Sequence, residues 1–142
     1  VYVNHSLPET INDGQGKAGI IRVSRITLKG DQLDLGTQVT ILDNQVQREQ
    51  CCHVGGSLAF DPQGNLYVSV GDNTNPFDSD GYSPNDPRPG RYPWDAMRSS
   101  ANANSLAGKI LRITPRPEGG YGIPEGNLFK PGTAGTRPEV YV

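Results

Sequence analysis

The chain has 142 residues, a formal net charge of −2 from 13 basic and 15 acidic residues, and a hydrophobic content of 34%. This length predicts one domain or a portion of a larger one. No apolar run approaches the ~20 residues that a membrane-spanning helix needs, and the balanced charge provides no basic surface for nucleic acid. We therefore expect neither a membrane span nor a nucleic-acid partner.

Short stretches of β-forming residues follow one another along the first part of the chain. We expect a strand over residues 1–5, a polar loop over 7–17, a strand over 19–28 and a further strand pair over 33–42. Alternation within residues 19–28 makes Ile21, Val23, Ile26 and Leu28 candidates for inward positions.

The clearest expected element is a hairpin over residues 57–71. Two apolar runs flank residues 61–65, which read Asp-Pro-Gln-Gly-Asn. Proline presets φ for the first turn position, and glycine permits the positive φ that follows. Leu66, Val68 and Val70 then share one face of the second strand.

Residues 72–104 differ from the rest, because they hold five prolines and show no sustained period. A segment this long without regular structure is usually functional or disordered. Strand signals return at residues 109–114, turns at residues 115–135 and a strand start at residues 139–142. No stretch shows the period of an amphipathic helix.

Short strands, regular spacing and glycine-rich turns predict an all-β fold: a sandwich, a barrel or a propeller. The sequence Asp-Pro-x-Gly-Asn-Leu-Tyr-Val is typical of blades in a β-propeller, and at ~40–50 residues per blade the length covers about three blades. A closed ring needs more blades. We therefore expect a partial propeller, in which residues 1–142 are a fragment of one domain truncated at both ends.

The two cysteines, Cys51 and Cys52, are adjacent. Their spacing fits no zinc pattern. Two interpretations remain open: a pair of reduced thiols in a half-buried loop, or a vicinal disulfide, which would imply an oxidising compartment.

Two histidines are present, and His53 is the better candidate for chemistry. It precedes Gly55 and Gly56, which allow the backbone to pass close to a neighbour, and imidazole suits proton transfer near neutral pH. Hairpin geometry brings Asp72 beside it, where a carboxylate can orient the ring. The alternatives are a histidine that caps a strand end and an aspartate that starts a turn; His5 is interpreted as structural or solvated.

The loop over residues 72–86 is rich in aspartate, which suggests a calcium site, but its sequence does not match the EF-hand pattern. Placing Gly81 at the sixth position of the loop puts Pro76 first and Pro87 twelfth, so the ligands at both ends are missing. A calcium site of another type stays open. No nucleophile elbow, phosphate-binding glycine loop or HExxH motif is present.

Taken together, these residues resemble the glucose/sorbosone dehydrogenase family. The segment from His53 through Gly55-Gly56 and the hairpin to Asp72, followed by Leu-Ala-Gly-Lys-Ile-Leu-Arg-Ile at residues 106–113, occurs in family order. The resemblance implies a six-bladed propeller that oxidises a sugar at its anomeric carbon with pyrroloquinoline quinone (PQQ) and calcium. Residues 71–77 and 94–100 are similar to a secreted bacterial branch, which implies a periplasmic or secreted protein.

The resemblance also implies roles for individual residues. His53 corresponds to the catalytic base and Asp72 to its supporting carboxylate, while Cys52 and Asn73 fall at cofactor-binding positions. The early cofactor motif is expected before Val1, and the calcium ligands after Val142. The implied partners are a small sugar and an electron acceptor such as a cytochrome or a quinone.

Two positions depart from the pattern. Soluble glucose dehydrogenases of that family carry an aspartate where this chain has Cys52, and a cofactor-contacting glutamine near Phe77. These departures favour an alternative, a non-catalytic propeller module that binds carbohydrate or protein. A third interpretation, a lactonase-type hydrolase, needs an axial metal site for which only loop aspartates are available.

Overall fold

The structure is a computed structural model, and it describes residues 1–8, 10–12, 16–77 and 79–142. The strands are β1 (Tyr2–Ser6), β2 (Ile11–Asn12), β3 (Lys17–Lys29), β4 (Gln32–Gln47), β5 (Gly55–Phe60), β6 (Leu66–Val70), β7 (Lys109–Pro115) and β8 (Tyr121–Gly122). Two 3₁₀ helices, η1 (Tyr92–Trp94) and η2 (Ala96–Arg98), are the only helices in the described part of the chain. Within it, no helix is long and apolar enough to cross a membrane.

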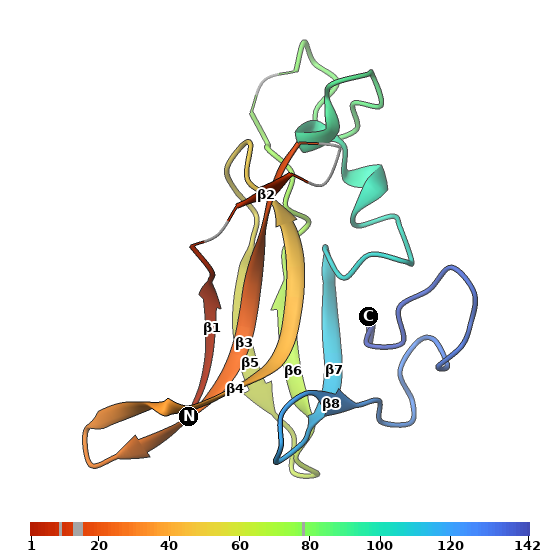
Figure 1. Cartoon of the computed structure of the whole chain (residues 1–142). Helices are drawn as coiled ribbons and strands as arrows, with labels where there is room; N and C mark the ends of the chain where they lie inside the picture. Colours follow the sequence, from red (N-terminus) through yellow and green to blue (C-terminus); the bar gives the residue numbers. More distant parts are fainter. Residues whose placement is uncertain (9, 13–15, 78) are drawn as a thin grey trace.

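The first sheet is built on the long antiparallel hairpin of β3 and β4 (Figure 1). Strands β1 and β2 both pair with the other edge of β3, β1 from Tyr2 opposite Arg25 to Ser6 opposite Ile21. The β3–β4 register shifts at two places, between Val23 and Ser24 and between Arg25 and Thr27. Such shifts bend a hairpin and increase its twist.

The second sheet has the order β5-β6-β7-β8 and is antiparallel throughout. The predicted hairpin is confirmed as β5 and β6. In its turn the Gly64 amide donates to the Asp61 carbonyl at 3.0 Å, and Gly64 has φ of 84°. The Asp61 carboxylate also accepts from the amides of Gln63 and Asn65, so the expected turn residues carry the turn.

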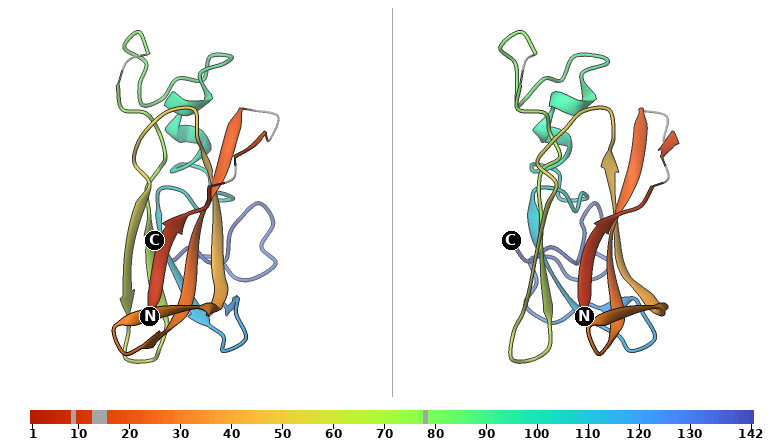
Figure 2. Two further views of the ribbon diagram at one scale, coloured as in Figure 1. Left: turned by 60° about the vertical axis from the view of Figure 1, so that its left-hand side comes forward. Right: turned by 90° about the vertical axis from the view of Figure 1, so that its left-hand side faces the viewer.

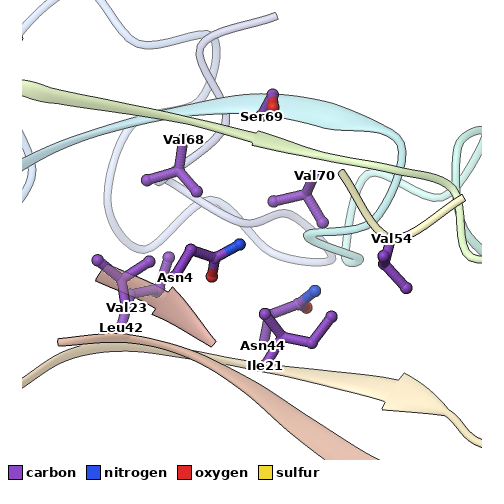
Figure 3. A pocket seen from close by; sticks show the side chains of 9 residues that line it. All are labelled: Asn4, Ile21, Val23, Leu42, Asn44, Val54, Val68, Ser69 and Val70. Carbon is purple, nitrogen blue, oxygen red and sulfur yellow. The ribbon is translucent and has the colours of Figure 1, made fainter. Parts of the chain in front are cut away.

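The two sheets pack face to face, and the core lies between them (Figure 2). Val23 and Leu42 of the first sheet face Val68 and Val70 of the second, as Figure 3 shows. The cavity that these side chains leave has a volume of only about 10 Å³, so it holds at most one water molecule. The predicted inward face of Leu66, Val68 and Val70 is confirmed as buried.

Several expectations need correction. Residues 33–42 do not form a strand pair, because they lie within one strand, β4. Leu28 is 50% exposed; it lies near the tip of the β3–β4 hairpin, after the register shift between Arg25 and Thr27. Residues 139–142 form a single bridge, Val140 to Leu111 of β7, in place of a strand.

The number of blades is also smaller than the length predicts. The described residues form two four-stranded sheets, whereas the length indicates about three blades. The difference lies in residues 71–77 and 79–108, which contribute two short 3₁₀ helices and turns but no strand, and in the turn-rich region after β8. Figure 1 shows residues 71–108 at one end of the two sheets, beyond the end of β6.

Candidate functional site

His53 and Asp72 lie close together at one end of the second sheet. This is the end at which the long segment between β6 and β7 begins. His53 lies two residues before β5, and Asp72 lies two residues after β6. Because β5 and β6 are antiparallel, the start of one and the end of the other share an end of the sheet. His53 Nδ1 is 2.9 Å from Asp72 Oδ1, and the two side chains are 46% and 22% exposed. The predicted pair is therefore brought together at the surface.

Glycines make this approach possible. A Cβ atom on Gly71 would lie 1.9 Å from the His53 carbonyl oxygen, and one on Gly55 would lie 2.6 Å from the Gly71 amide nitrogen. His53 itself has φ of 50°, in the left-handed region that few side chains adopt. The backbone around the imidazole is thus in close contact that no larger residue at position 71 permits.

Hydrogen bonds from Thr74, two residues further along the chain, help to hold Asp72 in the ionised form. Partial burial raises the pKa of Asp72, but hydrogen bonds from the hydroxyl and amide of Thr74 and from His53 outweigh it, so the pKa lies below its ordinary value. The Thr74 amide donates to Asp72 Oδ1 at 3.2 Å, and its hydroxyl donates to Oδ2. An ionised carboxylate only accepts, so His53 carries its hydrogen on Nδ1 and leaves Nε2 free to take a proton.

Asn73 connects the pair to the first sheet. Its side-chain oxygen accepts from the Gln47 amide at 2.7 Å, and its carbonyl accepts from Gln47 Nε2 at 3.2 Å. Both residues are buried. Asn73 also lines a polar cavity of about 150 Å³, with Gln47, Tyr92 and Arg98 among its walls. Its predicted role toward a cofactor stays a prediction.

Cys51 and Cys52 are joined in a vicinal disulfide directly before His53. Of the two interpretations that the sequence left open, the structure has the disulfide. Cys51 is exposed and Cys52 is half-buried. The cofactor-binding role of Cys52 stays a prediction.

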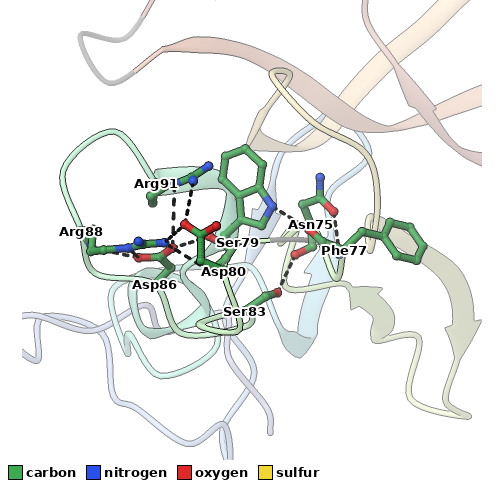
Figure 4. Close-up of polar contacts among 9 residues, drawn as sticks. Asn75, Phe77, Ser79, Asp80, Ser83, Asp86, Arg88 and Arg91 are labelled. Atoms are coloured by element: carbon green, nitrogen blue, oxygen red, sulfur yellow. Dashed lines mark hydrogen bonds and ion pairs between the residues drawn. The ribbon is translucent and has the colours of Figure 1, made fainter.

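A buried carboxylate, that of Asp86, is the centre of the polar contacts at the tip of the long segment between β6 and β7. Asp86 is 1% exposed, and Arg88 donates to it from Nε at 2.8 Å and from Nη2 at 2.7 Å (Figure 4). The hydroxyl of Ser79 also donates to it, and Asp80 accepts from Arg88 on the exposed side. These contacts hold the tip of the segment without strands.

Phe77 projects from the base of the same segment and is 67% exposed. Its amide donates to Asn75 Oδ1 at 2.8 Å, and its carbonyl accepts from Trp94 Nε1 at 2.8 Å. Both ends of the residue are therefore fixed while the ring stays in solvent, five positions after Asp72.

The described residues offer no set of ligands for the calcium site that the sequence left open. Among the residues that the structure describes, no three His, Cys, Asp or Glu side chains are grouped to hold an ion. Asp78, part of the acidic stretch considered for calcium, lies outside the described residues. His5 lies on β1, where its Nε2 is 3.0 Å from the hydroxyl oxygen of Ser24.

The sequence alone did not indicate Thr74 and Gln47. The Asp-x-Thr spacing of residues 72–74 fits an Asx turn, in which an aspartate accepts from the amide two residues on, and this signal was available. Gln47 ends β4 of the first sheet, whereas Asn73 follows β6 of the second sheet, 26 positions further along the chain. No local sequence pattern marks such a contact.

Two packed antiparallel sheets thus carry a histidine–aspartate contact at one end. The model of the family Glucose / Sorbosone dehydrogenase matches residues 1–142, and the chain belongs to this family. It is also similar to two solved structures of glucose dehydrogenases, at 26% identity and TM-scores of 0.58 and 0.55. Each match covers 98% of this chain but only 32% or 31% of the solved one, so the chain spans about a third of their length. Since these dehydrogenases are propellers, the all-β, partial-propeller fold is confirmed.

Proposed function

We propose that this chain supplies the acid–base pair of a PQQ-dependent sugar dehydrogenase, which oxidises an aldose at its anomeric carbon to a lactone. The observation that carries the proposal is the 2.9 Å contact between His53 Nδ1 and Asp72 Oδ1 at an exposed sheet end. Membership of the family and the two glucose dehydrogenase structures support it.

In the proposed reaction, His53 removes the proton of the anomeric hydroxyl. Asp72 accepts a hydrogen bond from the N–H of Nδ1, so the lone pair of Nε2 lies on the other side of the half-exposed ring, away from the carboxylate, and is left for a sugar. When the proton arrives on Nε2, the ring becomes a cation, and the ionised Asp72 stabilises this charge. When bound, PQQ supplies the two-electron acceptor that takes the anomeric hydrogen as hydride.

The described residues fit the proton-transfer part of this chemistry. The side-chain nitrogen of Asn73, Nδ2, has no hydrogen-bond partner among the described residues, and Asn73 borders the polar cavity of about 150 Å³. We propose that this nitrogen and Cys52 lie against the cofactor, on either side of the His53–Asp72 pair in sequence. For calcium the described part of the chain offers no ligand set, and we assign none of its residues to that ion.

The test is reconstitution of the protein at its natural length with PQQ and calcium chloride, followed by dye reduction with a panel of aldoses. We expect His53→Ala to lower kcat/KM by about 10²-fold or more, the scale of a lost general base. His5→Ala, which changes the other histidine of this chain, is the matched control and should retain activity. Equal activity in both variants would leave His53 without a catalytic role.

We further propose that the protein acts in the periplasm or outside the cell and passes electrons to an acceptor such as a cytochrome or a quinone. The Cys51–Cys52 disulfide supports the location, because disulfides persist in oxidising compartments. Fractionation of the native cells, with antibody detection of the protein, tests it.

A second candidate is a non-catalytic propeller that binds carbohydrate. The exposed ring of Phe77, carried on a backbone that Trp94 holds, favours it, because sugar rings pack well on exposed aromatic faces. Under this alternative the protein binds aldoses but not PQQ, and Phe77→Ala lowers the sugar affinity while His53→Ala does not. Calorimetric titration with PQQ and with sugars separates the two functions.

A further inference from the structure

The backbone on the amino-terminal side of His53 is fixed as far as Gln50. Gln47 Oε1 accepts from the Glu49 amide at 2.8 Å and from the Gln50 amide at 2.9 Å, while Gln47 Nε2 donates to the Gln50 carbonyl at 3.1 Å. The side chain of Gln50 also accepts from Asn75 Nδ2 at 3.0 Å. Gln50 is therefore held through its amide, its carbonyl and its side chain.

On the other side, the backbone is fixed again at His53. The His53 carbonyl accepts from the Asn73 amide at 2.9 Å, and the Val54 carbonyl accepts from the Gly71 amide at 3.2 Å. Only Cys51 and Cys52 lie between the two fixed points. Neither makes a hydrogen bond to any residue that the structure describes, and neither belongs to a strand.

The disulfide is thus the restraint on these two residues. Its ring includes the peptide bond between Cys51 and Cys52, so it limits the backbone torsions on both sides of that bond. The next residue is His53. Its left-handed φ of 50° is an unfavourable backbone conformation for any residue other than glycine. The direction from which the chain enters His53 is set by the disulfide ring.

We propose that the Cys51–Cys52 disulfide is a positioning element for the base: it holds the backbone that places the His53 imidazole against Asp72, and its reduction to two thiols loosens that placement. Reduction transfers two electrons and two protons to the sulfur atoms. A dithiol or phosphine reductant is oxidised in exchange. The proposal rests on the proposed function for its catalytic consequence, but its structural half does not.

The test compares three forms of the protein at its natural length: oxidised, reduced with a phosphine, and Cys51→Ser/Cys52→Ser. The first readout is hydrogen exchange of the Asn73 amide, which donates to the His53 carbonyl, with the Asp61 amide at the far end of the same sheet as internal control. We expect about tenfold faster exchange at Asn73 and no change at Asp61 in the reduced and serine forms. The phosphine should have no effect on the serine variant, which controls for other disulfides.

The second readout is dehydrogenase kinetics. A displaced base lowers kcat with little change in KM, and a misplacement near 1 Å costs on the order of 10²-fold, so we expect kcat to fall by about 10- to 100-fold. Unchanged exchange at Asn73 would overturn the proposal whatever the kinetics. Faster exchange with unchanged kcat would overturn its link to catalysis. An oxidised protein with no dehydrogenase activity refutes the proposed function alone, because the exchange readout needs no turnover.

Discussion

Gly71→Ala tests whether close backbone contact builds the site. The new Cβ would lie 1.9 Å from the His53 carbonyl oxygen, whereas ordinary contact begins near 3.4 Å, so the two segments must separate by about 1.5 Å. That separation breaks the bonds from the Gly71 amide to the Val54 carbonyl and from the Asn73 amide to the His53 carbonyl. Two lost hydrogen bonds and local overpacking together cost about 2–4 kcal/mol of unfolding free energy. A shift of this size at His53 also lowers kcat by about 10²-fold.

The assay for Gly71→Ala is urea unfolding followed by dye-linked turnover. Gly122→Ala is the matched control, because its Cβ would meet only Arg116 Nη2 at 3.8 Å and its φ is not in the left-handed region. We expect Gly122→Ala to change the unfolding free energy by less than about 0.5 kcal/mol. If Gly71→Ala matched the control in both stability and turnover, the argument that close contact places His53 would be refuted.

Three further predictions follow from the charged and polar contacts. Thr74→Val removes a hydroxyl that lowers the pKa of Asp72, so an NMR titration of this carboxyl should show its pKa raised by about one unit, whereas Thr74→Ser leaves it in place. Hydrogen bonds from Arg88 hold the pKa of Asp86 well below its ordinary 3.8 despite burial, so this carboxylate stabilises the fold above pH 3.8 and loses that effect as the pH falls through its folded pKa. Asp86→Asn should accordingly lower the urea midpoint at pH 7 and show a smaller deficit at pH 3; an equal deficit at both would contradict the assignment. Burial and a hydrogen bond to Glu139 raise the pKa of Tyr121 to about 12, so absorbance near 295 nm should show one tyrosine ionising there that Tyr121→Phe removes.

The sequence predicted most of the strands, because their signals are local. Alternating apolar residues and the turn at residues 61–65 were enough for β5 and β6, and the histidine and aspartate at the two ends of that hairpin were then neighbours by geometry. The position of Leu28 was not predictable, since it depends on a register shift between Arg25 and Thr27 that no alternation pattern encodes.

The parts of the site that escaped prediction depend on contacts across sheets or on covalent chemistry. Gln47 lies beyond the strand pair expected over residues 33–42, and only packing of the first sheet on the second brings it to Asn73. Among the described residues of the 72–104 stretch, Asp86 is buried against Arg88 and helps to hold the loop, whereas prolines and acidic residues in a sequence equally fit an open loop. Adjacent cysteines likewise fit both redox states until their surroundings are known.

The contact between Gln47 and Asn73 has a consequence for recombination between relatives. A crossover in the connection between β4 and β5 would exchange one sheet for that of a relative and keep the strands of both sheets, yet it would separate Gln47 from Asn73, its partner in this chain. Blade-swapped chimeras should therefore retain their strands and lose the site, unless the junction lies before Gln47. To transfer this site between relatives, the second sheet and its loop must be moved together with Gln47, the last residue of β4 in the first sheet.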